Sequence, residues 1–275
     1  MPYRTSEIFF GILRFDNEGI ATHTHNVVID KHKKIVHLDN WQDFAPEVAK
    51  RYKQTPALPH KPLLFRGQSD ASWKLLTTLE RDPTASLTVA DHYRKIEADK
   101  KRIETKTGRS WEKSDSHKLD QFGFRSDPLP DFEYMVYRRH EGHPSPLLDW
   151  TTCPDTAAFF AFSDESSPAT HVSIYVYQDE SMPREMTALN YPHFTQRGPY
   201  ILRCHDRHVN QRAVHTTCTV KDEWGWENVC HEAVLNESAE NPVLLWKFTL
   251  PSSQRTTVLG YLNTRGINTR ALLGT

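Results

Sequence analysis

The chain has 275 residues, of which 37 % are hydrophobic and 11 % aromatic, and its formal net charge is −1. This composition indicates a globular protein of one large or two modest domains. It argues against a disordered or fibrous chain and against a uniformly basic nucleic-acid-binding surface. No apolar run approaches the ~20 residues that a transmembrane helix needs. Four widely spaced cysteines predict free thiols in a reducing cytoplasm, and the acidic N-terminal segment predicts a mature N-terminus without a signal peptide.

The N-terminal part predicts short strands and one helix. Residues 1–38 alternate apolar and polar positions, which is typical of a strand pair or an N-terminal extension. Asp39 or Asn40 is placed to cap a helix that presents Trp41 and Phe44 on one side. Residues 61–67, KPLLFRG, predict a short strand that ends in a turn.

A charged insertion follows, from about residue 84 to residue 126. Its apolar stripe is thin, so the pattern predicts one exposed helix and a polar loop. A solvated face is the plainer interpretation. The alternative is contact with a partner or a nucleic acid, because basic residues cluster there: Arg94, Lys95, Lys100, Lys101 and Arg102.

The central stretch runs from a turn at Gly142 and Pro144 into the buried segment 147–150, LLDW, and then into a helix. Thr152 is the expected N-cap, and Pro154 presets the first turn. Alanines and phenylalanines then supply a packing face. A strand-to-helix junction of this kind directs backbone amides and hydroxyls outward, which favours an anionic or polar ligand.

Later patterns predict strands at residues 171–178, 212–220 and 243–250, and a last helix that stops at Gly266. Strands and helices do not alternate regularly in this half, which favours an α+β fold. We therefore expect one domain over residues 39–275, with the charged insertion inside it.

Several motifs resemble the FRG-domain family, which takes its name from a Phe-Arg-Gly tripeptide. They are Phe65-Arg66-Gly67-Gln68 followed by Trp73; His140-x-Gly142-x-Pro144 with Leu147-Leu148-Asp149-Trp150-Thr151; and Asn210-Gln211-Arg212. The order of these parts is also similar to that of ADP-ribosyltransferases of the arginine–serine–glutamate kind. The resemblance implies a split mixed or antiparallel β-sheet core with flanking helices and a polar helical insertion.

That resemblance implies a reaction in which NAD is the substrate. Such an enzyme binds the diphosphate, holds the nicotinamide amide and stabilises an oxocarbenium-like transition state. We expect the catalytic residues to be Arg66, Asp149, Thr151 and His215. The expected NAD-binding residues are Phe65, Arg66, Gly67, Gln68, Trp73, His140, Trp150, Thr151, Thr152, Phe160 and Arg212.

The chemistry of the individual side chains explains the roles expected of them. Arg66 suits a phosphate because a guanidinium makes bidentate, always-charged contacts. Trp73 or Trp150 is suited to stacking, and Thr151 and Thr152 offer hydroxyls. Asp149 would stabilise the oxocarbenium charge.

Plainer interpretations stay open for the same residues. Arg66 at a strand end also suits a structural ion pair, Asp149 suits an acceptor for turn amides, and Trp150 suits the core. His215 is either a base or a strand histidine. The acidic or amide residue that the family layout places on a later strand has no clear match. Glu223, Glu227 and Glu232 are the candidates.

The predicted function is an NAD-dependent mono-ADP-ribosyltransferase, toxin-like, that modifies RNA or another nucleic acid, or a protein. A protein antitoxin is a possible partner, and no membrane and no metal are expected. The alternatives are a metal-independent ribonuclease that uses His140 and His215 as acid and base, and a non-catalytic interaction module. The first hypothesis requires Arg66 and Thr151 to meet at one open cavity.

Overall fold

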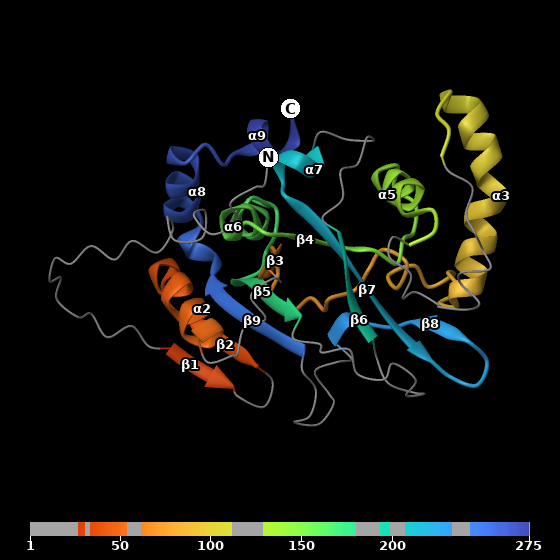
Figure 1. The fold of residues 1–275 in the computed structure, drawn as a ribbon. Helices are drawn as coiled ribbons and strands as arrows, with labels where there is room; N and C mark the ends of the chain where they lie inside the picture. Colours follow the sequence, from red (N-terminus) through yellow and green to blue (C-terminus); the bar gives the residue numbers. More distant parts are fainter. Residues whose placement is uncertain are drawn as a thin grey trace, which may run out of the picture.

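The computed structural model describes residues 27–30, 34–53, 62–111, 129–179, 193–198, 207–232 and 243–274. These residues form one mixed sheet of nine strands in the order β1-β2-β9-β5-β3-β4-β7-β6, with β8 paired to β7 (Figure 1). The pairing of β2 with β9 is parallel and the other pairings are antiparallel. The strands are Val27–Asp30, Ile35–Leu38, Leu64–Gln68, Leu148–Thr151, His171–Asp179, His193–Arg197, Ala213–Lys221, Trp226–Asn228 and Val243–Pro251.

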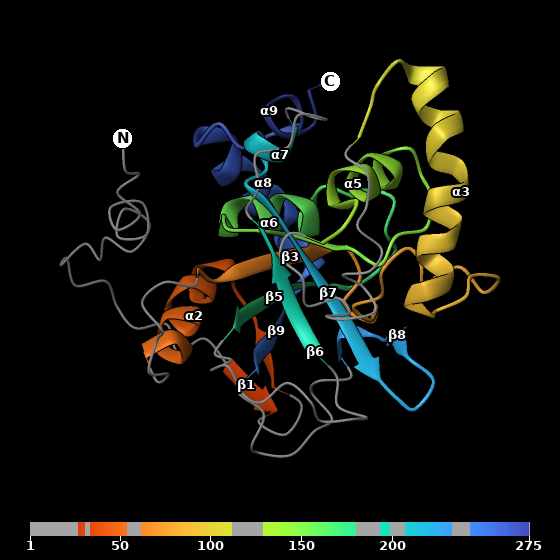
Figure 2. The ribbon, with the colours of Figure 1, turned by 45° about the vertical axis from the view of Figure 1, so that its right-hand side comes forward.

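Helices lie over both halves of this sheet, so the predicted α+β class is confirmed. Near the N-terminal strands lie η1 (Trp41–Asp43) and α2 (Phe44–Lys53). The charged insertion contains the long helix α3 (Val89–Thr107), which lies on the outside of the molecule beside α5 (Phe132–His140) (Figure 2). The remaining helices are α6 (Pro154–Phe162), α7 (Arg207–Asn210), η4 (Ser252–Gln254), α8 (Arg255–Thr264) and α9 (Thr269–Leu273).

Helix α6 packs very closely on β3, and the sequence explains why. Pro154 stands in its first turn, and the alanines Ala157, Ala158 and Ala161 are fully buried. A Cβ atom at Gly67 on β3 would lie 1.9 Å from the Ala157 carbonyl oxygen and 2.6 Å from the Ala161 nitrogen. Gly67 is therefore required for helix–sheet packing, whatever else its backbone does.

The N-terminus of α6 differs from the prediction. Its N-cap is Cys153 rather than Thr152, and no side chain caps it. Instead the Thr151 hydroxyl accepts from the Cys153 amide at 3.0 Å. The prediction for the first helical segment was right, because Asn40 accepts from the Gln42 amide at the start of η1.

The core has three parts. One lies where α2, α6 and α8 cover β3, β5 and β9, and it is almost entirely apolar. A second lies on the other face of β3, β4, β5 and β7 and includes Trp150 and Tyr175. The third joins α3 to α5 and includes Tyr93, Ile96 and Met135. The predicted exposed helix thus has a thin apolar stripe that packs against α5.

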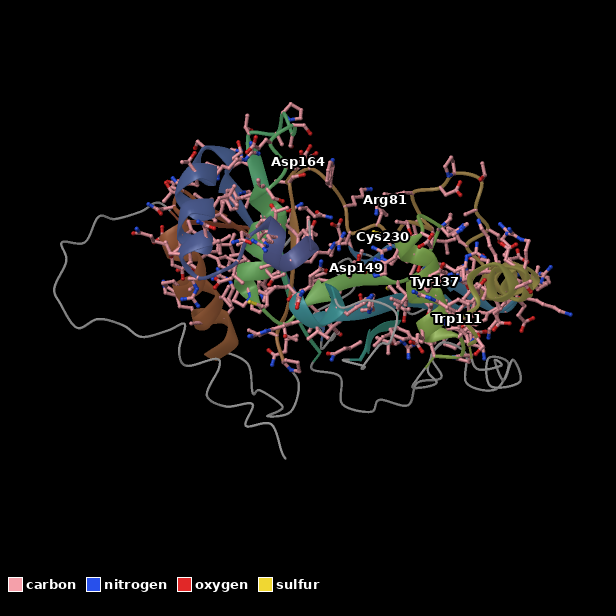
Figure 3. The ribbon with its side chains drawn as sticks, turned by 90° about the horizontal axis from the view of Figure 1, so that it is seen from above. Arg81, Trp111, Tyr137, Asp149, Asp164 and Cys230 are labelled. Carbon is pink, nitrogen blue, oxygen red and sulfur yellow. The ribbon has the colours of Figure 1, made fainter. Side chains whose placement is uncertain are left out.

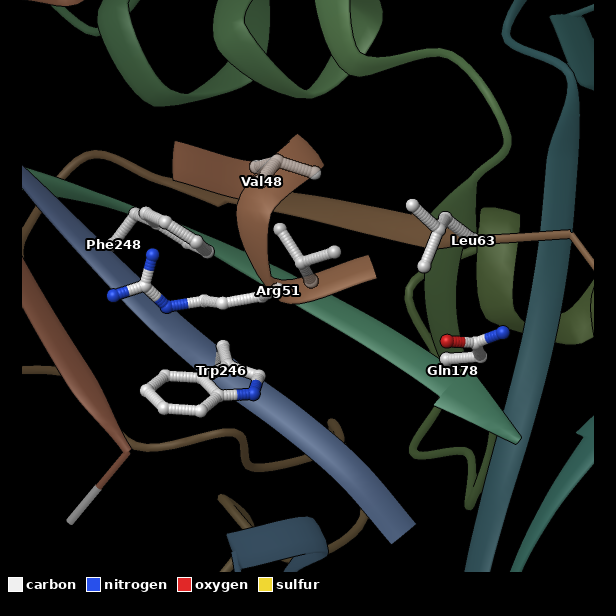
Figure 4. Close-up of a pocket in the computed structure, with 7 residues that line it drawn as sticks. Val48, Arg51, Leu63, Gln178, Trp246 and Phe248 are labelled. Carbon is white, nitrogen blue, oxygen red and sulfur yellow. The ribbon is translucent and has the colours of Figure 1, made fainter. Parts of the chain in front are cut away.

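A small cavity of about 20 Å³ lies in the first half, between α2 and β9. There the Arg51 guanidinium lies 4.7 Å from the centre of the Trp246 ring and is also hydrogen bonded to Glu47 at 2.7 Å (Figure 4). The cavity is too small for an organic ligand, and these contacts are typical of a cation–π packing site.

Candidate functional site

The two strands that carry the FRG and LLDWT motifs separate from each other. β3 pairs with β5 at five positions, from Leu64 to Gln68, but with β4 only at Phe65, opposite Thr151. Past that pair the Arg66 side chain takes the place of the strand pairing, and its Nη1 donates to the Asp149 carbonyl oxygen at 2.8 Å. The sheet is therefore open between β3 and β4.

A cleft of about 730 Å³ lies at this opening. Asp149 and Arg81, which both line it, lie in the central part of the molecule (Figure 3). Its walls come from β3, β4, β7, α6 and the segment after β3. The lining residues are Phe65, Arg66, Gly67, Gln68, Ser69, Trp73, Lys74, Leu76, Arg81, His140, Asp149, Trp150, Thr151, Ala157, Phe160, His208, Gln211, Ala213 and His215.

The structure brings most of the expected site residues to this cleft. All four expected catalytic residues line it, Arg66, Asp149, Thr151 and His215. Of the expected NAD-binding residues, only Thr152 and Arg212 are absent from its walls. Arg212 is exposed, with a left-handed backbone at φ 48°. Arg66 and Thr151 thus meet at one open cavity, as the first hypothesis requires.

Arg66 is the most constrained charge in the cleft. Burial lowers its pKa to about 10; the nearby Asp149 carboxylate raises it, and the positive charges of Arg139 and Arg81 lower it further. The guanidinium stays protonated at neutral pH. Its Nε is buried and, within the described residues, has no hydrogen-bond partner. An unsatisfied buried donor is costly, and other atoms of the same side chain line the cleft.

Asp149 is held by two side chains. Arg139 donates to both of its carboxylate oxygens, with Nε at 2.8 Å from Oδ1, and His215 Nε2 lies 3.3 Å from Oδ1. Burial raises the pKa of Asp149, but the charge of Arg139 and the hydrogen bond from His215 outweigh it and hold the pKa well below its ordinary value. About 45 % of the Asp149 side chain remains exposed, while Arg139 is 10 % exposed. The carboxylate is charged and accessible from the cleft.

Three histidines lie along one wall. His140 Nε2 lies 2.9 Å from His208 Nε2, and the His208 and His215 rings are 5.5 Å apart. His140 is exposed, and the other two are nearly buried. The row therefore leads from the surface to the Asp149 carboxylate.

Two expected ligand-binding groups already have partners inside the protein. The Trp150 indole is 3 % exposed and donates to Thr216 Oγ1 at 2.7 Å. The Thr151 hydroxyl donates to the Gln211 carbonyl oxygen at 2.6 Å and accepts from Cys153. Trp73, by contrast, is 49 % exposed at the cleft. The geometry favours Trp73 over Trp150 as a stacking ring.

Sequence reasoning missed five polar residues of the cleft: Ser69, Lys74, Arg81, His208 and Gln211. Lys74 and Gln211 are direct neighbours of residues that the motifs had singled out, Trp73 and Arg212. Gln211 is the middle residue of the Asn-x-Arg motif, but the prediction selected the last residue of that motif, Arg212. Arg81 is distant from the motifs in the sequence, and it reaches the cleft because the segment 73–81 folds back over the sheet.

The candidate late carboxylates do not line the cleft. Glu232 accepts from the Tyr175 hydroxyl at 2.6 Å and from the Leu75 amide at 3.1 Å, which is a structural role. Glu223 and Glu227 lie on or beside β8. Asp149 is thus the carboxylate that the described cleft offers.

Among the described residues, no group of three or more histidine, cysteine, aspartate or glutamate side chains is arranged to hold a metal ion. In the same part of the chain, none of the helices combines the length and apolar character needed to cross a membrane.

Part of the chain matches a known protein family. Residues 61–170 match the family model of the FRG domain. No curated protein and no solved structure matches the chain significantly. The matched segment includes β3, α3, α5, β4 and α6, and it ends before the strand that carries His215.

Proposed function

We propose that this chain, which belongs to the FRG-domain family, is an NAD-dependent mono-ADP-ribosyltransferase whose substrate binds in the cleft between β3 and β4. One observation carries the proposal. The strand bearing Arg66 and the strand bearing Asp149 separate around an open cleft, and both side chains line it.

The residues of the cleft fit NAD. Its volume of about 730 Å³ is in the usual range for ligand sites, roughly 300–1,000 Å³. Arg66, Lys74 and Arg81 supply positive charge for a diphosphate, and the exposed ring of Trp73 suits a nicotinamide or adenine.

The chain's own residues then have distinct tasks. Asp149, which is ionised at neutral pH, stabilises the positive charge that develops on the ribose as its bond to nicotinamide breaks. His215 accepts the proton that the acceptor group loses as its bond to the ribose C1′ forms, because the contact of Nε2 with Asp149 leaves Nδ1 as the basic nitrogen. Arg139 positions Asp149 without touching the substrate.

The opening between β3 and β4 supports an ADP-ribosyltransferase-like split sheet as the finer description of the fold. For the acceptor we propose a nucleic-acid base, in RNA, because Trp73, Lys74 and Arg81 together offer stacking and phosphate binding at the cleft. Such an enzyme would be a toxin-like cytoplasmic effector, and an antitoxin protein would act by covering this cleft. If the label in the test below enters protein and not RNA, the acceptor is a protein.

Incubation with NAD labelled in its adenylate part tests the proposal. Label should enter RNA or protein, and nicotinamide should be released. Arg66→Lys keeps the charge but loses the planar guanidinium, so transfer should fall by about 100-fold or more. Arg94→Lys on exposed α3 is the matched control and should transfer normally. Normal transfer by Arg66→Lys would contradict the proposal.

The row of histidines favours a second candidate, a metal-independent ribonuclease. His140 and His215 line the same cleft and are bridged by His208, an arrangement that offers an acid and a base beside a phosphate held by Arg66. Cleavage of RNA without NAD, lost in His140→Ala, would favour this candidate. If the protein neither transfers ADP-ribose nor cleaves RNA, the remaining interpretation is a non-catalytic interaction module.

A further inference from the structure

A second cavity lies on the other side of the segment after β3, between α3 and α5. Its volume is about 80 Å³, room for two or three waters at about 30 Å³ each, or for one tetrahedral oxyanion. Its polar lining consists of Asp82, His92, Lys95, Arg138 and Ser145. None of these residues lines the cleft between β3 and β4.

His92 is the unusual member of this lining. It is 6 % exposed, and in the part of the chain that the structure describes its Nε2 has no hydrogen-bond partner. Burial, with the positive charges of Arg138 and Lys95, lowers its pKa to about 4. A buried nitrogen without a partner is costly, and the His92 side chain lines a cavity that a small ligand would fit.

The side chains that line the cavity carry more positive than negative charge, although Asp99, outside the lining, pairs with Arg138. Lys95 and Arg138 are positive, and Asp82 is the one carboxylate in the lining. The Asp82 carboxylate already accepts from the Thr84 amide at 2.9 Å and the Thr84 hydroxyl at 2.6 Å. Arg138 also donates to Asp99 at 2.8 Å, but with one of its nitrogens only. Donors therefore outnumber free acceptors.

We propose that this cavity binds a phosphate group, with Lys95, Arg138 and His92 Nε2 as donors to its oxygens. The site is distinct from the proposed NAD cleft but adjoins it. The Thr78 hydroxyl accepts from Arg139, which holds Asp149, and also from the Ser145 amide of the cavity wall. The proposal does not depend on ADP-ribosyl transfer, since its ligand is recognised by charge and shape alone.

Thermal unfolding in inorganic phosphate tests the site, with chloride at matched ionic strength as the reference. The Tm should rise saturably, by about 3–6 °C at ten times the Kd. His92→Leu removes the unpartnered nitrogen, so the Tm without phosphate should be unchanged or higher while the rise is lost. Lys95→Gln, at an exposed position, should weaken phosphate binding about tenfold or more.

Lys101→Gln is the matched control, because it removes the same charge from an exposed position of α3 outside the cavity. It should keep the full rise in Tm. No saturable rise in the wild-type protein, or an equal rise in His92→Leu and Lys95→Gln, would overturn the proposal. Comparing inorganic phosphate with a nucleoside 5′-monophosphate identifies the source of the phosphate, since the tighter ligand is the natural one.

Discussion

The two halves of the sheet are built from different side chains. Where α2, α6 and α8 cover β9, β5 and β3, most of the buried side chains are aliphatic or aromatic, with a few polar ones such as Thr156 and Thr249, and β5 pairs with β9 at nine positions. Strand β7 and its neighbours instead bury polar side chains, among them Arg197, His215, Thr217 and His231. The cleft lies at the boundary, where β3 and β4 separate. The apolar half fixes Arg66 in place, and the polar half supplies the titratable groups.

The polar half stays folded because its buried groups are hydrogen bonded to one another. The Trp150 indole donates to Thr216 Oγ1 at 2.7 Å, and the same oxygen lies 2.9 Å from His231 Nε2. Arg197 Nε lies 3.2 Å from Thr217 Oγ1. The contact with His231 depends on the protonation state of that histidine, whereas apolar packing has no such dependence. The two halves should therefore respond differently to volume changes and to pH.

The largest effect is expected from Gly67→Ala, which breaks the apolar half. A new Cβ would lie 1.9 Å from the Ala157 carbonyl oxygen, so α6 must move away from β3. We expect a loss of about 5 kcal/mol in the free energy of unfolding, among the largest that one substitution causes. Urea unfolding followed by circular dichroism measures it.

Gly260→Ala is the matched control for that change. Gly260 lies inside α8, and an added Cβ would meet nothing within 4 Å. Alanine favours a helix over glycine, so the variant should gain about 0.5–1 kcal/mol. A cost below about 1 kcal/mol for Gly67→Ala would mean that α6 and β3 are not packed as closely as the structure shows.

The second-largest effect is a loss of stability of the polar half when the pH is lowered. Burial and the positive charge of Arg66 lower the pKa of His231 to about 3. The unfolded chain binds this proton near pH 6.5, so stability is complete above about pH 6.5 and is lost as the pH falls toward 3. This one group should account for roughly 4 kcal/mol of acid destabilisation. His231→Gln should flatten that part of the stability profile, measured by urea unfolding at a series of pH values.

His171→Gln provides the comparison, since His171 is exposed at the start of β5. Its profile should follow that of the wild-type protein. A His231→Gln profile as steep as the wild type would show that the histidine is protonated in the folded state, in conflict with its burial.

Sequence patterns predicted the apolar half better than the polar half. The strands expected at residues 171–178 and 243–250 are β5 and β9, and the helix expected to stop at Gly266, whose φ is 74°, is α8. It is not the last helix as predicted, because the short α9 follows it. In these segments the apolar residues recur with the period of a strand or of a helix, and this pattern follows directly from which side chains are buried. Strand β6 was not predicted, because its sequence HFTQR buries an arginine through contacts with β7 that a local pattern does not contain.

In the candidate site, too, local sequence patterns did not predict contacts between different elements. The motifs singled out Arg66 and Asp149, and the chemistry of histidine singled out His215; the structure brings the three to one cleft. The partner of Asp149 was not predicted: the carboxylate was expected to accept from turn amides, and it is held by Arg139 ten residues earlier. Helix α5 and strand β4 must pack side by side before that pair can form. Residues 1–26, part of the expected N-terminal extension, lie outside the described residues.

Arg139→Gln should have an intermediate effect. It removes the ion pair with Asp149 and the hydrogen bond from Arg139 Nη1 to Thr78 at 3.2 Å. With Arg139 only 10 % exposed, we expect a loss of about 2 kcal/mol in stability. The pKa of Asp149 should rise toward its ordinary value of 3.8, which NMR titration of the carboxyl carbon measures. An unchanged pKa would contradict the pairing.

The smallest effect is expected from the corresponding pair of the apolar half. Arg265 Nε donates to Asp155 Oδ2 at 2.7 Å in the first turn of α6, but the Arg265 side chain is 39 % exposed. Water and salt screen such a pair, so Arg265→Gln should cost about 0.5 kcal/mol, and less in about 1 M salt. The loss caused by Arg139→Gln should be larger at low and at high salt, because Arg139 donates to both Asp149 oxygens and also to Thr78, whereas Arg265 donates to one oxygen of Asp155. If both variants lost the same stability with the same salt dependence, the additional contacts of Arg139 would contribute nothing, and Asp149 would be held no more firmly than Asp155.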